Sequence, residues 1–183
     1  MTIADLLEET GAIRTGHFLL SSGKHSDVYV EKARMFERPQ VVMRMAERIA
    51  GWHDDIQAVV SPAVGALPLG FAVAVAAGAR FLYAERADRR LAFRRGFRLE
   101  PGERTLVVED VVTTGGSAAE VVELVRAAGA NVLGVAAMVD RSAGDLGFPL
   151  RALARIDARA FDPDACPLCR EGSSPEAPGS RHR

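Results

Sequence analysis

Residues 105–128 read TLVVEDVVTTGGSAAEVVELVRAA. Within this stretch, Leu106 to Val108 form an unbroken aliphatic run, which is typical of a strand that is buried on both faces. Two acids, Glu109 and Asp110, follow at the carboxyl end of this strand. A glycine-rich loop and an apolar-sided helix pattern come next. The stretch therefore predicts a strand–loop–helix unit with an acidic pair where the strand ends.

The loop over residues 113–117 has the composition of a phosphate cradle. Gly115 and Gly116 allow positive φ and let backbone N–H groups approach an anion closely. Ser117 and Glu120 have the Ser-x-x-Glu spacing of a helix start, where unpaired N–H donors and the positive end of the dipole attract anions. The threonine and serine hydroxyls add donors. No lysine follows the glycines, so this loop is not a Walker loop.

The acidic pair indicates what lies beside the phosphate. Glu109 and Asp110 would repel a phosphate, whereas carboxylates suit a sugar diol or a divalent cation. A phosphate at the loop and hydroxyls at the acids together describe a ribose 5-phosphate. The alternative is a capped strand–helix turn whose acids are incidental.

The segment VVEDVVTTGGS, residues 107–117, resembles the signature of type I phosphoribosyltransferases, which bind phosphoribosyl pyrophosphate (PRPP). The resemblance implies an α/β fold with a Rossmann-like, mainly parallel sheet flanked by helices and a small N-terminal hood. It also implies Mg²⁺ as a cofactor, held through the substrate with Glu109 and Asp110 nearby. The two acids would hold the ribose hydroxyls and favour the cationic transition state. The PRPP-binding residues implied here are Glu109, Asp110, Val111, Val112, Thr113, Thr114, Gly115, Gly116 and Ser117.

Composition places the chain among ordinary globular proteins. It has 183 residues, 48% of them hydrophobic, and a net charge of −1. This charge gives no sign of nucleic acid or an anionic membrane as partner. Asp5, Glu8 and Glu9 exclude the basic start of a signal peptide, and the apolar run 63–79 contains Pro68 and is short for a membrane span. We therefore expect a cytoplasmic protein.

Strand and helix patterns alternate along the chain, which predicts a parallel sheet with helices on both faces. Expected helices cover residues 2–10, 39–50, 68–77 and 117–128. Expected strands cover residues 17–20, 28–32, 56–60, 80–84, 106–108, 132–139 and, at an edge, 150–156. Residues 85–99 are expected to form a mobile loop or a hairpin.

The predicted domain organisation is simple for a chain of this length. One phosphoribosyltransferase domain covers residues 1–165, with its hood at about 1–37 and its core at about 38–156. Residues 166–183 are expected to form a Cys-x-x-Cys turn and a loose tail rich in Ser, Pro and Gly.

Ligands of such sheets bind beyond the carboxyl ends of the strands. The loop after strand 56–60 lies there, and the resemblance assigns its residues Ala63, Val64 and Gly65 to the pyrophosphate of PRPP. The alternative for this loop is an ordinary strand–helix turn.

The insertion over residues 85–97 is rich in arginine. The functional interpretation is a lid over the departing diphosphate, where preorganised cations stabilise the transition state and closure excludes water. Related enzymes carry lysines and a histidine here; arginine keeps the charge but cannot act as a general acid. Arg86 and Arg89 are the candidates for binding PRPP, and Arg86 for catalysis. The alternative is a solvated charged loop.

The base-binding prediction comes from two further segments. FLLSSGKHSDVYV, residues 18–30, is similar to the Ser-Gly segment of orotate phosphoribosyltransferases, and Asp140-Arg141 matches their Asp-Arg pair. By this resemblance Tyr29 and Val30 lie over the pyrimidine, while Thr113 and Arg141 contact orotate, whose carboxylate fits a guanidinium.

Two points in these segments stay open. Some family members have a lysine where this chain has Ser21, and Lys24 or His25 is the candidate to replace it at orotate. Arg141 has an alternative interpretation as a surface salt bridge with Asp140 or Asp145.

Cys166 and Cys169 form a single Cys-x-x-Cys pair. Such a pair supplies half of a tetrahedral zinc site, which His182, other residues or a second subunit would complete. The alternative is two reduced thiols in a turn.

The sequence thus predicts an orotate phosphoribosyltransferase, a pentosyltransferase that joins orotate to PRPP and releases pyrophosphate and orotidine 5′-monophosphate in UMP biosynthesis. The family implies a homodimer. Two alternatives remain: a phosphoribosyltransferase for another base, such as a purine, and a PRPP-binding regulatory protein without turnover, which the lysine-free lid would suit.

Overall fold

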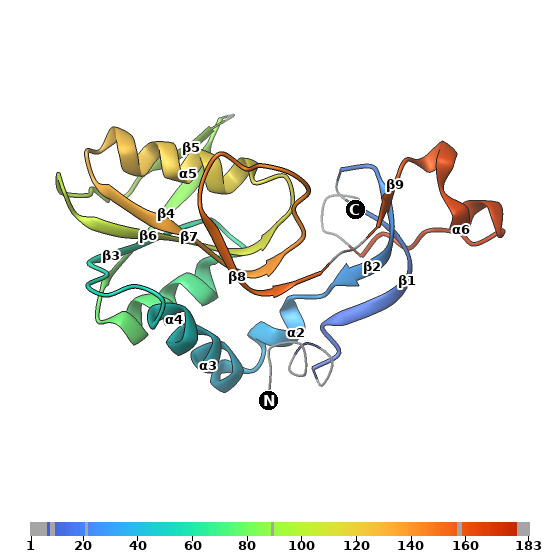
Figure 1. Ribbon diagram of the computed structural model, residues 1–183, viewed down its shortest axis with the longest axis horizontal. Helices are drawn as coiled ribbons and strands as arrows, with labels where there is room; N and C mark the ends of the chain where they lie inside the picture. The colour runs from blue at the N-terminus through green and yellow to red at the C-terminus, as the bar shows by residue number, and fades with distance from the viewer. Residues whose placement is uncertain (1–6, 8–9, 21, 89, 157–158, 179–183) are drawn as a thin grey trace. The chain divides into compact units, whose positions relative to one another are not determined.

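The computed structural model describes residues 7, 10–20, 22–88, 90–156 and 159–178. The chain divides into two compact units (Figure 1). Unit 1 combines the two ends of the chain, residues 1–35 and 157–183, and unit 2 is the continuous stretch 36–156. The helix predicted over residues 2–10 lies almost entirely outside the described residues.

Unit 2 is built on one sheet with strand order β5-β4-β3-β6-β7-β8. Neighbouring strands pair in parallel, except β4 and β5, which are antiparallel. The predicted α/β fold with a mainly parallel sheet is confirmed, and the strand predicted at an edge is there. The strands are β3 (Ala58–Pro62), β4 (Arg80–Ala87), β5 (Arg90–Phe93), β6 (Arg104–Val112), β7 (Asn131–Asp140) and β8 (Leu150–Arg155).

Helices cover both faces of this sheet. On one face α3 (Pro39–Ala50) packs beside α4 (Leu67–Ala77), and on the other lies α5 (Gly116–Ala127) (Figure 1). Proline stands at the start of α3, where its missing N–H costs no hydrogen bond. The buried side of α3 is aliphatic, and α5 packs Val121, Val122 and Val125 onto the sheet. This burial of aliphatic faces is what binds the helices to the sheet.

Strand β6 is longer than the predicted strand 106–108. It pairs with β7 as far as Val112, which lies opposite Asp140. Glu109 and Asp110 therefore belong to the strand itself and do not follow it. The aliphatic run alone gave too short a strand. Hydrogen bonding to β7 extends β6 through the two acids to Val112.

The insertion after Ala84 is a hairpin, which was one of the two predicted outcomes. Strand β4 continues to Ala87, and β5 returns antiparallel to it, with Arg86 opposite Leu91. Leu91 is buried against the α5 side of the sheet. The hairpin is thus attached to unit 2 by an apolar residue of its own.

Unit 1 contains a small antiparallel sheet with order β1-β2-β9. Its strands are β1 (Ile13–Leu19), β2 (His25–Val30) and β9 (Ala160–Phe161); the short helices are α2 (Ala33–Phe36), the 3₁₀ turn η1 (Pro163–Ala165) and α6 (Pro167–Arg170). Phe18 is 2% exposed, and the centre of its ring lies 5.6 Å from that of Tyr29, with the two rings tilted by 37°.

Part of the expected loose tail is bonded to β1. The backbone N–H of Glu176 donates to the His17 carbonyl at 2.8 Å, and the N–H of Leu19 donates to the Glu176 carbonyl at 2.8 Å. The carboxylate of Glu176 also accepts from Arg14 at 2.7 Å. Glu176 therefore pairs with Phe18 of β1 as an isolated parallel β-bridge.

Within the described part of the chain, no helix combines the length and the apolar character needed to cross a membrane.

Candidate active site

The acidic pair of β6 is almost fully buried: Glu109 is 8% exposed and Asp110 is 4% exposed. Each carboxylate accepts a hydrogen bond from the next backbone N–H, from Asp110 N to Glu109 Oε1 at 3.1 Å and from Val111 N to Asp110 Oδ1 at 2.6 Å. Hydrogen bonds of this kind offset part of the cost of burying a charge. Two adjacent carboxylates held in this way form a strongly electronegative strand end.

A hollow of about 70 Å³ opens where β6 passes into α5. Its lining residues are Glu109, Val111, Val112, Thr113, Thr114, Gly115, Gly116, Ser117 and Ala118. The structure thus brings the predicted phosphate loop and Glu109 around one concave surface. Asp110 is not among the lining residues, although both of its neighbours in the chain are.

Gly115 fits its place for two reasons. Its φ is 74°, in the left-handed region that glycine adopts without strain. A Cβ built on it would lie 2.9 Å from Leu146 Cδ2 and 3.2 Å from Phe148 Cζ. Gly115 is also the residue before α5, so the first N–H groups of that helix face the loop.

The Ser-x-x-Glu spacing predicted a helix start at Ser117, and the side-chain cap that this spacing suggests is absent from α5. The helix begins at Gly116, its N-cap is Gly115, and no side chain caps it. Glu120 instead reaches the hairpin, where it accepts from the Leu91 N–H at 2.7 Å and from Arg86 Nη1 at 3.0 Å. A partner from a distant strand displaced the local bond that the Ser-x-x-Glu spacing suggested.

The contact between Glu120 and the hairpin lowers the pKa of Glu120 and fixes the position of Arg86. Burial by itself raises the pKa of the Glu120 carboxyl, but the Leu91 N–H and the Arg86 guanidinium outweigh it and hold that pKa below its ordinary value. Arg86 is a lid candidate, and its guanidinium is bonded to α5 through both Glu120 oxygens. The hairpin is therefore fastened to the helix that carries the phosphate loop.

The remaining lid arginines are distributed unevenly. Arg95 forms a bidentate pair with Glu85, with N–O distances of 2.8 and 3.0 Å, and its hydrogen bond lowers the pKa of Glu85. Arg90 and Arg94 are exposed on the hairpin. Arg89, the second PRPP candidate, lies outside the described residues.

The predicted pyrophosphate loop leaves β3, which lies next to β6 in the sheet. Ala63 donates its N–H to the Ala84 carbonyl at 2.8 Å, the peptide bond from Ala63 to Val64 is cis, and Val64 is 77% exposed. Because β3 and β6 are parallel neighbours, this loop and the phosphate loop emerge at the same sheet edge.

The orotate candidates of unit 2 lie together. The backbone N–H of Arg141 donates to the Val112 carbonyl at 2.8 Å, so Arg141 emerges beside Thr113 at the end of β6. The neighbouring Asp140 accepts from Ser142 N at 2.7 Å and from Arg155 Nη1 at 2.9 Å.

The other orotate candidates belong to unit 1. Val30 is buried, at 7% exposure, and the ring of Tyr29 lies in tilted contact with the ring of Phe18. Lys24 Nζ lies 3.3 Å from Asp162 Oδ1, and both side chains are largely exposed. In the segment FLLSSGKHSDVYV, residues 18–19 thus end β1 and residues 25–30 form β2.

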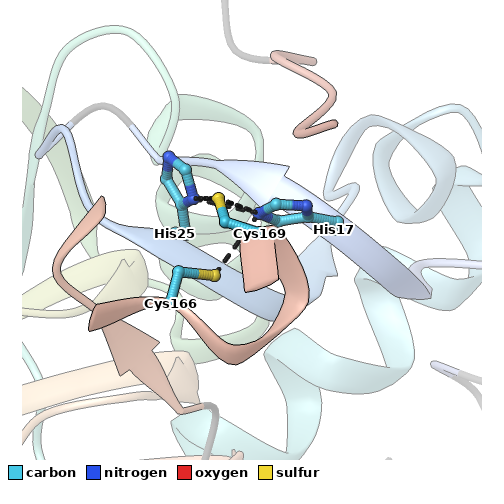
Figure 2. Close-up of side chains that lie close together, drawn as sticks. All are labelled: His17, His25, Cys166 and Cys169. Carbon is cyan, nitrogen blue, oxygen red and sulfur yellow. Dashed lines mark hydrogen bonds between the residues drawn. The ribbon is translucent and has the colours of Figure 1, made fainter. Parts of the chain in front are cut away.

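The Cys-x-x-Cys pair has partners that the sequence analysis did not assign. Cys166 and Cys169 lie beside His17 and His25, on the antiparallel sheet of unit 1 (Figure 2). His182, the partner suggested from sequence, lies outside the described residues. The available signal was the presence of one histidine in the strand predicted over residues 17–20 and another just before the strand predicted over residues 28–32, since a hairpin brings such positions together.

Comparison with known proteins gives a consistent result. The phosphoribosyl transferase domain family matches residues 33–146 of this chain. The orotate phosphoribosyltransferase of Thermotoga maritima is 48% identical over 98% of both chains, and that of Caldanaerobacter subterraneus subsp. tengcongensis is 45% identical over 98% of this chain and 96% of its own. The crystal structure of orotate phosphoribosyltransferase from Aeropyrum pernix matches with a TM-score of 0.69 and 28% identity, over 85% of this chain and 94% of that chain.

These matches confirm the resemblance carried by residues 107–117 and 18–30. They extend over nearly the whole chain and not only over the phosphate loop. With the parallel sheet and the hollow at the end of β6, they show that the chain belongs to the type I phosphoribosyltransferase family and, within it, to the orotate phosphoribosyltransferases.

Proposed function

We propose that this chain transfers the ribose 5-phosphate group of PRPP to N1 of orotate, giving orotidine 5′-monophosphate and pyrophosphate. The observation that carries the proposal is the hollow lined by residues 109–118, which combines a glycine-rich anion site with a buried carboxylate. Because the chain belongs to the orotate phosphoribosyltransferases, we assign the anion site to the 5-phosphate of the sugar and the carboxylate to the sugar hydroxyls.

Each part of the loop has a task in this proposal. The N–H groups at the start of α5 and the hydroxyls of Thr113, Thr114 and Ser117 hold the 5-phosphate. Glu109 and Asp110 accept hydrogen bonds from the ribose hydroxyls. Their negative charge also favours the positive charge that develops on the sugar as the C1–O bond breaks.

The donor set also fits a divalent cation. Carboxylate oxygens are ligands that Mg²⁺ prefers, and Glu109 and Asp110 place two carboxylates at one strand end. Mg²⁺, bound with the substrate, would supply positive charge to the diphosphate.

Arg86 and Arg89 are proposed to cover that diphosphate, together with the N–H groups of Ala63, Val64 and Gly65. Arginine suits this role because its guanidinium binds phosphate through two parallel hydrogen bonds. The Arg86–Glu120 pair supports a hairpin that is positioned before the substrate arrives.

For the base, Arg141 is proposed to bind the carboxylate of orotate, with Thr113 beside it. Tyr29, Val30 and Lys24 are proposed to contribute from unit 1. The backbone hydrogen bond from Arg141 to Val112 supports the first part, because it holds the main chain of Arg141 beside the end of β6, where the phosphate loop begins.

A homodimer in the cytoplasm is proposed from the family. Helix α4 supports the dimer: Phe71 and Val75 lie one turn apart on it and are 59% and 56% exposed. Apolar side chains in contiguous exposed positions commonly mark an interface.

The test is direct. The purified chain is incubated with PRPP, Mg²⁺ and orotate, and the loss of orotate absorbance is followed. We expect orotate to be consumed, and hypoxanthine or adenine to be left unchanged in parallel reactions. Binding of PRPP without consumption of orotate would identify a regulatory protein, and turnover of a purine would identify a different phosphoribosyltransferase.

A further inference from the structure

Four side chains that can bind a metal ion meet in unit 1, away from the phosphate loop in sequence. They are His17 of β1, His25 of β2, Cys166 at the end of η1 and Cys169 of α6. Their four ligand atoms all lie within 4.8 Å of one another, and Figure 2 shows them pointing toward a common centre. Both histidines and Cys166 are buried, at 8%, 7% and 0% exposure.

The fold explains why these residues converge. Leu19 pairs with His25, so His17 lies two positions along β1 from the partner of His25, which is a diagonal cross-strand position. On its other side His25 pairs with Phe161 of β9, and the chain then passes through η1 into α6. The cysteines of the C-terminal segment are thus brought beside the two histidines of this small sheet.

The distances fit a tetrahedral centre. His17 Nε2 lies 2.9 Å from His25 Nδ1 and 3.5 Å from Cys166 Sγ, while Cys169 Sγ lies 3.3 Å from His25 Nδ1 and 3.8 Å from His17 Nε2. A tetrahedral zinc ion with bonds of about 2.0 Å to nitrogen and about 2.3 Å to sulfur separates its ligand atoms by roughly 3.3 to 3.8 Å. These four separations lie close to the tetrahedral values, and the remaining pairs of ligand atoms are no more than 4.8 Å apart.

The orientation of His17 is fixed from outside the cluster. Its Nδ1 lies 3.0 Å from the carbonyl oxygen of Ser173 and 3.2 Å from the Ser173 hydroxyl. A carbonyl only accepts, so Nδ1 carries the proton and Nε2 presents its lone pair to the cluster. This is the arrangement in which the outer nitrogen of a metal-binding histidine is usually found.

We propose that His17 Nε2, His25 Nδ1, Cys166 Sγ and Cys169 Sγ bind one Zn²⁺ ion as a structural site. Two thiolates and two imidazoles in tetrahedral arrangement select zinc. All four positions are filled by protein, so the ion has no open position for a substrate. Its role is to join the C-terminal segment to the hairpin of β1 and β2.

The competing interpretation is a cluster of two neutral thiols and two imidazoles held by hydrogen bonds alone. It differs from the zinc site in metal content, in spectrum and in the reactivity of the thiols. The experiment therefore measures these properties and uses no activity assay, so its result is independent of the orotate reaction.

The full chain is purified without chelators, and its metal content is measured by plasma mass spectrometry. We expect about one zinc ion per chain. After removal of the metal, Co²⁺ is added: a tetrahedral site with two thiolates gives intense visible bands and a thiolate-to-cobalt band in the near ultraviolet. Zinc should bleach these bands and protect Cys166 and Cys169 from alkylation.

Variants locate the site. Cys169→Ser and His25→Gln should each abolish the tight Co²⁺ spectrum, whereas His53→Gln, a histidine of unit 2, should retain it. Because a variant could fail to fold, the titration of the metal-free native chain decides on its own. A native chain that binds neither zinc nor cobalt, a spectrum without thiolate bands, or a Cys169→Ser variant with native affinity would overturn the proposal.

Discussion

Gly115 is a position in the phosphate loop where both the backbone conformation and the surrounding side chains disfavour any residue larger than glycine. A Gly115→Ala change would place a Cβ at positive φ and against Leu146, and the conformation alone costs about 1 to 2 kcal/mol. We expect a lower free energy of unfolding and a raised KM for PRPP, measured by urea titration and by initial rates.

The next residue provides the matched control. A Cβ on Gly116 would meet Thr114 Oγ1 at 3.7 Å, an ordinary contact, and Gly116 lies within α5. Gly116→Ala should leave the free energy of unfolding unchanged or raise it by up to about 1 kcal/mol. Equal destabilisation by both changes would show that φ and the contact with Leu146 are irrelevant.

The two buried acids are expected to act on the reaction more than on the fold. Glu109→Gln and Asp110→Asn keep the shape of each side chain but remove its charge, and loss of one such transition-state contact commonly lowers kcat by about 10²- to 10³-fold. Rates are measured by orotate absorbance, with Glu123→Gln on the exposed side of α5 as control. A variant with native kcat would exclude that acid from transition-state stabilisation.

The hairpin of β4 and β5 is the element on which the lid proposal depends. Replacing Arg86 and Arg89 together by Ala should lower kcat while leaving ribose 5-phosphate binding unchanged, because these arginines are proposed to contact the diphosphate and not the 5-phosphate. Rapid kinetics and calorimetry measure the two quantities. Arg44→Ala, on the exposed side of α3, is the control. Native turnover in the double variant would remove both arginines from the mechanism.

The contact between this hairpin and α5 predicts a pH dependence. The pKa of Glu120 is lowered in the folded protein, so its stabilising contribution is present above the unfolded pKa, about 4.3, and is lost as pH falls through the folded value. The free-energy difference between native protein and Glu120→Gln is expected to be less than about 1 kcal/mol near neutral pH, since the pair is partly exposed. Urea unfolding should show this difference shrinking in acid.

Local patterns predicted the elements of unit 2 well, and the reason is physical. A strand such as β6 is recognised from its aliphatic run, and a helix such as α3 from its one apolar side. Both patterns lie within a few consecutive residues of the sequence. Glu120 shows where this fails: its spacing to Ser117 is that of a cap, yet a guanidinium 34 residues away binds it. The completion of the cysteine cluster was missed for the same reason, because Cys166 and His17 are 149 residues apart.

At the scale of the whole molecule, the exposed apolar residues of α4 predict where two chains would meet in a dimer. We expect the native chain to sediment as a dimer, and Phe71→Glu to shift it toward the monomer, because a charge cannot be buried unpaired in an apolar interface. Analytical ultracentrifugation measures this, and Arg44→Glu on α3 should leave the dimer intact. A native monomer, or a Phe71→Glu dimer of native stability, would rule α4 out as the interface.

The division of unit 1 between residues 1–35 and 157–183 has a consequence for biosynthesis. Unit 2 is continuous, so it can fold as the nascent chain leaves the ribosome. Cys166 is translated 149 residues after His17, a delay of roughly 7 to 30 s at the usual 5 to 20 residues per second. During that interval the hairpin of β1 and β2 lacks the two cysteines. Unit 1 can complete its folding only after translation has passed residue 176.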